Sequence, residues 1–234
     1  MLFLPPVRWS FLLLVAALAA LPACWGGVTG AQGPAVNASL KTAVATKDAL
    51  VIADTLEDLI AAGVDTPEDR QLAYAEVRAH AVDTAAYTFA RAVVTGRLVQ
   101  LKGLLGADMV GEVEHYARRS RQLDPTFRDG AATRMLGTLY VVAPAALLRN
   151  GDSETGLELL EGLVQKAPDI IENHLRVAEA YIALGDVDPA KPHLCRCSAD
   201  RGKLRRDDQA LLAQLLKDAG NPTCPKPAAT APTP

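Results

Sequence analysis

The chain has 234 residues, of which 50% are hydrophobic, 5% aromatic and 22% charged, and its formal net charge is −3. This length suits one domain or a short solenoid with a buried core, and the near-neutral charge excludes a nucleic-acid-binding protein that depends on bulk positive charge. Few aromatic residues and many Ala and Leu residues favour helices over a β-sandwich. No useful stretch alternates as a β-strand does. We therefore predict an all-α protein.

The first 36 residues predict a targeting segment. Arg8 precedes the apolar run Phe11–Ala23, which is too short to cross a bilayer but suits a signal peptide. The run ends in Leu-Pro-Ala-Cys at positions 21–24, which resembles a bacterial lipobox and predicts a lipidated Cys24. The absence of Asp at the next position, Trp25, resembles lipoproteins sent on to the outer membrane. We expect residues 1–23 to be removed, residues 24–36 to form a flexible tether and the lipid to hold the protein at the periplasmic face of the membrane. The alternative is an ordinary signal peptide with a chance cysteine.

Helical periodicity continues along the chain. Apolar residues at helical spacing predict a helix over Leu40–Ile60, stopped by Gly63. Thr66 then predicts an N-cap, with proline in the first turn of a long helix over Pro67–Val94. A further helix from about residue 109 to 121 should end at Asp124-Pro125, because the residue before proline avoids the helical region.

The second half carries an internal repeat of 34 residues. Gly151-Asp152 recurs as Gly185-Asp186, and Leu160 matches Leu194 in the same register. This period, with a Gly-Asp turn between paired helices, is typical of the tetratricopeptide repeat. Between the two units, Pro168 should close one helix and Asp169 should cap the next.

These patterns together predict the domain organisation. We expect residues 37–220 to form a tetratricopeptide-like α-α superhelix of antiparallel helix pairs that ends in a capping helix over Lys203–Ala219. The expected outer face of that helix consists of Arg205, Arg206, Asp207, Asp208 and Lys217. Residues 221–234 should form a proline-rich extended tail.

Three cysteines lie in the C-terminal part of the chain. Cys195 and Cys197 are two residues apart on a predicted helix, so they point to different sides and pair poorly with each other. Cys224 lies just past the capping helix and can return to either. We predict a disulfide between Cys197 and Cys224, because Cys197 shares a helix face with the inward-facing Leu194. The alternative, a metal site formed by His193 and the three cysteines, lacks the usual C-x2-C spacing. We expect no metal and no other cofactor.

The stretch Met135–Leu148 contains no charged residue. A helix that is apolar on every side is buried all round or lines a hydrophobic groove. Pro144 should kink or end this helix, and Gly137 permits close approach of another helix. Arg134 opens the run, and we expect it either to pair with Asp129 or Asp124 or to meet a carboxylate ligand at the mouth of an apolar cavity. The candidate ligand- or partner-binding residues are Arg134, Leu136, Leu139, Tyr140, Val142 and Leu147.

No sequence motif indicates catalysis. The four histidines are scattered, and the zinc-protease, nucleophile-elbow, dinucleotide and P-loop motifs are all missing. We interpret Glu114 and Arg118 as an i,i+4 ion pair on a solvated helix face. Arg118, Arg119 and Arg121 form a basic cluster that is too small for nucleic acid but suits an acidic partner surface or lipid headgroups. We therefore expect a non-enzymatic protein with no nucleic-acid partner.

Two segments carry a resemblance to a known family. Residues 123–144 (LDPTFRDGAATRMLGTLYVVAP) and 157–186 (LELLEGLVQKAPDIIENHLRVAEAYIALGD) resemble the T-component family of TRAP transporters. The match covers roughly Tyr87–Pro189 and the lipobox, and its most specific part is the string Arg134, Gly137, Tyr140 and Pro144.

This resemblance implies a function as well as a fold. It implies a periplasmic lipoprotein of tetratricopeptide-like helices that serves as a non-catalytic partner of a periplasmic substrate-binding protein. Such a partner helps to feed a small carboxylate or apolar ligand to membrane subunits and shelters that ligand in a cavity. The second hypothesis is a general tetratricopeptide scaffold for cell-envelope assembly, which holds a peptide or a partner helix on its surface.

Overall fold

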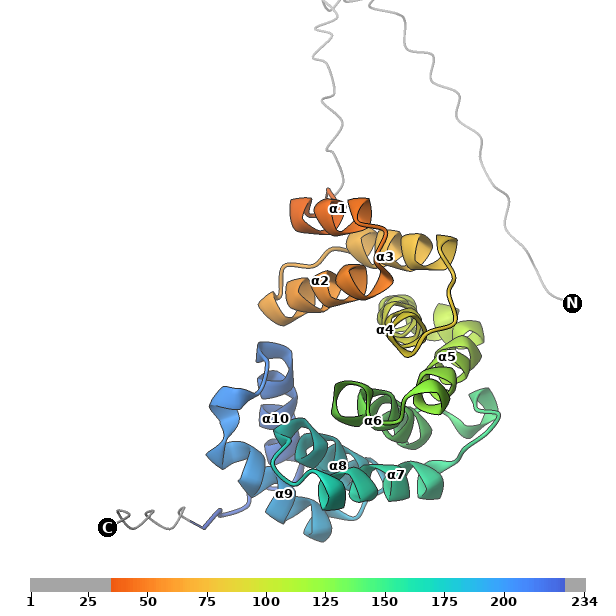
Figure 1. Ribbon diagram of the computed structural model, residues 1–234. Helices are drawn as coiled ribbons and strands as arrows, with labels where there is room; N and C mark the ends of the chain where they lie inside the picture. The colour runs from red at the N-terminus through yellow and green to blue at the C-terminus, as the bar shows by residue number, and fades with distance from the viewer. Residues whose placement is uncertain (1–34, 226–234) are drawn as a thin grey trace, which may run out of the picture. The chain divides into compact units, whose positions relative to one another are not determined.

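A computed structural model describes residues 35–225, and these are all-α, as predicted (Figure 1). Three short 3-10 helices, η1 (Gly103–Met109), η2 (Ala145–Leu147) and η3 (Arg201–Lys203), stand between the α-helices. The α-helices of this part of the chain are α1 (Ala38–Ala45), α2 (Ala49–Ala62), α3 (Pro67–Ala79), α4 (Ala85–Lys102), α5 (Val110–Leu123), α6 (Phe127–Val142), α7 (Ser153–Lys166), α8 (Ile171–Ala183), α9 (Val187–Ala199) and α10 (Arg206–Asp218). Consecutive helices pack against each other in pairs, as in a helical-repeat superhelix. None of the helices in residues 35–225 combines the length and the hydrophobicity needed to cross a membrane.

Two helices that the sequence predicts as continuous are each broken by a capping residue. The predicted helix over residues 40–60 is split into α1 and α2, because Lys47 has a left-handed φ of 58° and the Asp48 side chain accepts hydrogen bonds from the first amides of α2. The predicted helix over residues 67–94 is split into α3 and α4, because the Thr84 side chain caps α4 through the amide of Tyr87. Helix α4 then continues through Gly96 to Lys102. An N-cap inside an apolar pattern satisfies backbone amides that would otherwise be unpaired, and it therefore starts a new helix.

Three of the other predicted start and stop signals are confirmed, and one is wrong. Gly63 ends α2 in the left-handed conformation, with a φ of 70°. Thr66 and Asp69 form a reciprocal capping box at the start of α3. Helix α5 ends at Leu123, directly before Asp124-Pro125. The predicted Asp169 cap is wrong, since Ile170 precedes α8 and supplies no side-chain hydrogen bond.

The core follows the repeat in the second half of the chain. Leu160 and Leu194, which are equivalent in the 34-residue repeat, are both fully buried, as are the small residues Ala178 and Ala190. Leu212 of α10 packs in the same cluster. These small residues let neighbouring helices approach closely while the leucines fill the space between them.

Helices α6 and α7 make a particularly close approach. A Cβ atom added at Gly137 would lie 2.6 Å from Leu160 Cγ and 2.9 Å from the carbonyl oxygen of Gly156. The prediction that Gly137 permits close helix packing is therefore confirmed, and Gly156 supplies the matching position on α7.

Helix α10 returns to the N-terminal helix α2, and this contact joins the two ends of the described helix series (Figure 1). Arg205 donates to the backbone carbonyl of Glu57 (2.7 Å) and pairs with its carboxylate (3.1 Å). The same carboxylate holds Arg97 of α4 at 2.5 Å. Asp208 is buried and pairs with Arg176 of α8 at 2.6 Å. The predicted solvated outer face is confirmed for Arg206 and Lys217, which are exposed, and is wrong for Asp208, which is buried against Arg176. Arg205 and Asp207 are partly buried, because Arg205 contacts Glu57 and pairs with Asp207.

Candidate functional site

The predicted apolar run on α6 does not enclose one common cavity. Leu136 and Tyr140 are buried in the core, whereas Val142 is 50% exposed at the end of the helix. Leu139 and Leu147 are half-buried, and Leu147 lies in η2 beyond the helix. Helix α6 ends two residues before Pro144, as predicted. The six candidate residues of this region therefore divide between packing against neighbouring helices and facing solvent.

Arg134 has a structural partner that the sequence did not indicate. Its guanidinium donates to the side-chain oxygen of Asn173 on α8 at 2.5 Å, and Asn173 is itself buried and donates to the carbonyl of Ala167. Burial lowers the pKa of Arg134. The predicted ion pair with Asp129 or Asp124 is wrong, and Arg134 instead ties α6 to α8.

A polar cleft lies beside α5. It has a volume of about 300 Å³. Helix α5 forms one wall, and the loop between α6 and α7 forms the other. Its lining residues are Gly111, Glu114, His115, Arg118, Arg119 and Gln122 from α5 and Arg149 and Asn150 from the loop. We call this feature the arginine cleft.

Glu114 joins the two walls of the arginine cleft. Its carboxylate accepts hydrogen bonds from the Tyr140 hydroxyl (3.1 Å) and from the backbone amides of Arg149 (2.9 Å) and Asn150 (2.8 Å). Burial alone would raise the pKa of Glu114, but these hydrogen bonds lower it below its usual value. The prediction of a solvated Glu114–Arg118 ion pair is wrong, because Glu114 is fully buried.

The three arginines of the cleft differ in their partners. Arg119 is engaged in a two-point contact with Asp83. Arg118 makes one long hydrogen bond, 3.4 Å, to the carbonyl of Asn150, and Arg149 lies over Gly111, where an added Cβ would be 3.7 Å from its Nε. Within residues 35–225, no carboxylate lies within ion-pair distance of Arg118 or Arg149.

A second unusual feature is an apolar tip between α4 and α5. Leu104 and Leu105 in η1 are 95% and 87% exposed, and Leu101 at the end of α4 is partly exposed beside them in sequence. Gly106 fits tightly against the backbone of Val99, so η1 folds back on the end of α4. Two adjacent leucines in solvent are costly unless a partner covers them. We call Leu101, Leu104 and Leu105 the leucine tip.

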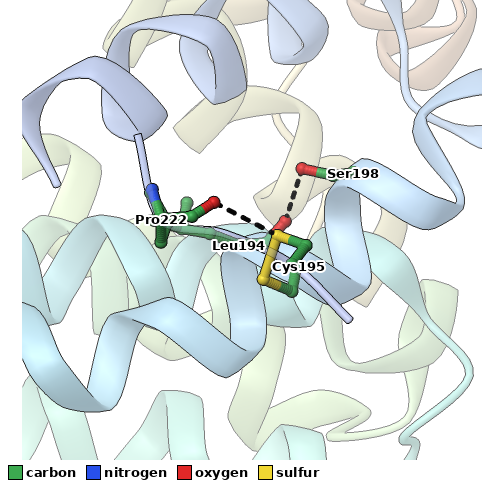
Figure 2. Close-up of a disulfide and its surroundings, with 5 residues drawn as sticks. Leu194, Cys195, Ser198 and Pro222 are labelled. Carbon is green, nitrogen blue, oxygen red and sulfur yellow. Dashed lines mark hydrogen bonds between the residues drawn. A yellow bond between two sulfur atoms is a disulfide. The ribbon is translucent and has the colours of Figure 1, made fainter. Parts of the chain in front are cut away.

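The cysteines pair differently from the prediction. The structure contains a disulfide between Cys195 and Cys224 (Figure 2), and the predicted Cys197–Cys224 bond is wrong. Cys197 does face the core with Leu194, as expected, but that inward direction takes its sulfur away from the tail. Burial raises the pKa of the Cys197 thiol to about 12, so this thiol is not reactive at neutral pH.

His193 contacts His174 (Nδ1 to Nδ1, 2.9 Å), and the metal site of His193 and the three cysteines that was considered from the sequence does not form among the described residues.

Comparison with known proteins does not extend this description. No protein-family model matches the chain, and no curated protein matches it. The resemblance to the TRAP T-component family therefore rests on the residues quoted above. Cys24, the predicted lipidation site, lies outside the described residues.

Sequence reasoning missed two parts of this surface. It identified the basic cluster on α5 but not Arg149, which lies 31 positions after Arg118 and joins it only through the fold. It also missed the leucine tip, for which the segment Gly-Leu-Leu-Gly at 103–106 is a usable signal. Glycines on both sides of two leucines interrupt the helical pattern and leave the leucines without a helix face to bury.

Proposed function

We propose that this protein is a non-catalytic docking protein, anchored to a bacterial membrane in the periplasm through a lipid on Cys24. In this proposal it serves a TRAP-type transporter by holding the periplasmic substrate-binding protein. The observation that carries the docking function is the leucine tip, whose two adjacent leucines are almost fully exposed. Burial of such leucines against a partner supplies about 1.5–3 kcal/mol for each fully covered side chain.

The buried charged groups support a structural role for the helices. Glu114 and Asp69 each accept a hydrogen bond from a distant segment, and Asp208 forms an ion pair with Arg176 of α8. Buried Arg91 pairs with Glu112 at 2.6 Å and lies over the rings of Tyr74 and Tyr116. These groups stabilise the helix stack and are not available to a partner. The leucine tip offers exposed apolar side chains, and the arginine cleft offers guanidinium groups without a carboxylate partner within residues 35–225.

The proposal assigns docking, and not ligand shelter, to this part of the chain. Leu136 and Tyr140 fill the core between helices, and the arginine cleft contains no residue of the run from Met135 to Leu148. The choice of a solute-binding protein as the partner rests on the resemblance at residues 123–144 and 157–186.

The docking function is tested by photo-crosslinking in living cells of the native host. A photoreactive amino acid replaces Leu104 in the full chain, and a matched control carries it at exposed Ala213 on α10. We expect ultraviolet light to link the Leu104 variant, and not the Ala213 variant, to a periplasmic solute-binding protein identified by mass spectrometry. The absence of any protein adduct specific to the Leu104 variant would contradict docking through the leucine tip.

The second candidate function is a scaffold for cell-envelope assembly. The observation that favours it is the tetratricopeptide-like packing of α7, α8 and α9, since one such solenoid serves many partners. The same crosslinking experiment separates the two candidates. Adducts with envelope-assembly proteins support the scaffold, and adducts with a solute-binding protein support the transport accessory.

The lipid anchor is tested independently of the partner. Cells grown with radiolabelled palmitate should label the wild-type protein, and the membrane fraction should contain it. The Cys24→Ser variant should lose the label, because the thiol that accepts the lipid is gone. An unlabelled wild-type protein that is recovered in the soluble periplasmic fraction would refute the anchor.

A further inference from the structure

We propose that the arginine cleft binds a carboxylate side chain of an acidic segment on the docked partner. This inference rests on the proposed docking function and adds the chemistry of the contact. It assigns the recognition to Arg118 and Arg149, which lie on opposite walls of the cleft.

The first argument is the unbalanced charge of the cleft. Its lining contains three arginines and one carboxylate, Glu114, and Arg119 is already neutralised by Asp83. Elsewhere in residues 35–225, seven arginines pair with carboxylates and five do not, but none of those five lines the cleft. The arginines paired in this way are Arg70, Arg91, Arg97, Arg128, Arg176, Arg196 and Arg205. Arg118 and Arg149 face a concave surface without such a partner, and a guanidinium offers the geometry that a carboxylate needs.

The second argument is that the cleft is held in shape before anything binds. Glu114 on α5 accepts the backbone amides of Arg149 and Asn150, and this fixes the loop against the helix. The Tyr140 hydroxyl on α6 adds a third hydrogen bond to the same carboxylate. Because these interactions fix both walls, little conformational entropy is lost when a ligand bridges them. Burial raises the pKa of Tyr140, and Arg118, which lies beside the same hydroxyl, partly offsets this rise. Glu114 nevertheless forms no ion pair with Arg118 or Arg149 among the described residues.

The third argument favours a protein segment over a free small anion. Gly111 and Gln122 lie eleven residues apart on α5 and both line the cleft, so the lining extends about 16 Å along the helix. That length accommodates several residues of a peptide. In addition, the charge of Glu114 opposes a small, multiply charged ion that enters the cleft deeply, whereas a carboxylate held on a peptide stops at the arginines.

The experiment measures peptide binding by fluorescence anisotropy on the purified chain at 0.15 M salt. The probe is a fluorescein-labelled hexaglutamate peptide, and hexaglutamine is its uncharged counterpart. The variants are Arg118→Gln and Arg149→Gln, and the matched control is Arg121→Gln, an exposed arginine on the same helix that is not part of the lining. Circular dichroism melts establish that each variant is folded.

We expect hexaglutamate to bind the wild-type protein and hexaglutamine not to bind. Each cleft variant should weaken the affinity about tenfold, the usual effect of losing one charge-assisted hydrogen bond. The control variant should change the affinity less than about twofold, because its charge is screened by solvent.

Three results would overturn the inference. The first is equal weakening by all three variants, which indicates only general charge attraction. The second is displacement of hexaglutamate by inorganic phosphate at equal concentrations of ligand charge, which indicates a site for a free anion. The third is stronger binding to phosphatidylglycerol vesicles than to the peptide, with the same dependence on Arg118 and Arg149, which indicates a lipid headgroup site.

The failure of this inference is distinguishable from the failure of the proposed function. If Leu104 is crosslinked to a partner in cells and R118Q with R149Q leaves that adduct unchanged, docking stands and the carboxylate contact is wrong. If hexaglutamate depends on the two arginines but no partner is crosslinked at Leu104, the cleft stands and docking through the leucine tip is wrong.

Discussion

The contact between α2 and α10 should be a major source of stability, and Glu57→Gln tests it. Glu57 holds Arg97 at 2.5 Å and Arg205 at 3.1 Å, and its side chain is only 16% exposed. Burial lowers the pKa of Arg97, but the hydrogen bond and charge of Glu57 outweigh this and raise it. The substitution therefore removes the nearer of two carboxylates that Arg97 and Arg205 share, and leaves both guanidinium groups with Asp207 alone, at 3.8 Å and 3.2 Å.

The magnitude follows from the burial of the pair. Two unit charges 4 Å apart attract by about 4 kcal/mol at an effective dielectric constant of about 20, and desolvation offsets part of this. We expect E57Q to lower the free energy of unfolding by about 2–3 kcal/mol, between the values for exposed and fully buried pairs. In a domain of this size the melting temperature should fall by roughly 5–10 °C.

The matched control is Asp54→Asn on the same helix. Asp54 pairs with Arg128 at 2.5 Å, but both side chains are about 40% exposed, so its loss should cost less than about 1 kcal/mol. Calorimetry gives the melting temperatures, and hydrogen exchange should show faster exchange at the amides of α10 in E57Q alone. If E57Q and D54N destabilise equally, or if exchange in α10 does not change, then the α2–α10 contact does not stabilise the protein.

Three further changes test other parts of the structure. Replacing both Cys195 and Cys224 with Ser should lower the free energy of unfolding by about 3–4 kcal/mol, as expected when a disulfide closes a loop of this size. Urea titration measures this loss, and the reduced wild-type protein should show the same free energy of unfolding as the variant. Gly137→Ala should destabilise the protein by about 1–3 kcal/mol, because the new methyl group meets Leu160. The control Gly162→Ala, with no neighbouring atoms at the added Cβ, should be neutral or stabilising. Equal melting temperatures of the two variants would refute the close α6–α7 packing. Burial alone would raise the pKa of Asp69, but hydrogen bonds from Asn37 and Thr66 lower it. The contribution of Asp69 to the free energy of unfolding is therefore complete above its unfolded-state pKa of about 4. It is lost as pH falls through the lower folded-state pKa. Asp69→Asn should accordingly flatten the loss of stability on acidification below about pH 4, and an unchanged slope in urea titrations from pH 5 to pH 2 would contradict this.

The helix boundaries show how far local signals reach. Gly63, Thr66 and Asp124 act on their own neighbouring backbone, and all three were predicted correctly. Asp48 and Thr84 also act locally, but they lie inside apolar patterns that continue across the break. The periodicity of side chains does not report a short interruption of the backbone, so the two extra helix starts were missed.

The candidate site shows what local sequence signals do not predict, namely which side chains a distant segment buries. The sequence located the basic residues of α5, but it placed Glu114 on a solvated face, where the structure buries it under Tyr140 and the loop at residues 149–150. Whether a charged residue on a helix faces solvent depends on which loop later covers it. That covering segment lies about 35 residues away and has no local signature near Glu114.

The sequence alone determined the all-α class, the 34-residue repeat and the helix ends at Gly63, Thr66 and Asp124, because these depend on neighbours within one or two turns. Only the tertiary structure decided that Cys195 and not Cys197 meets Cys224, and that Arg205 meets Glu57 across 148 positions. Small rotations between successive helices add up along the superhelix, and their sum sets which distant faces meet. No single helix encodes that sum, so the closing contact and the two walls of the arginine cleft arise only when all the helices are packed.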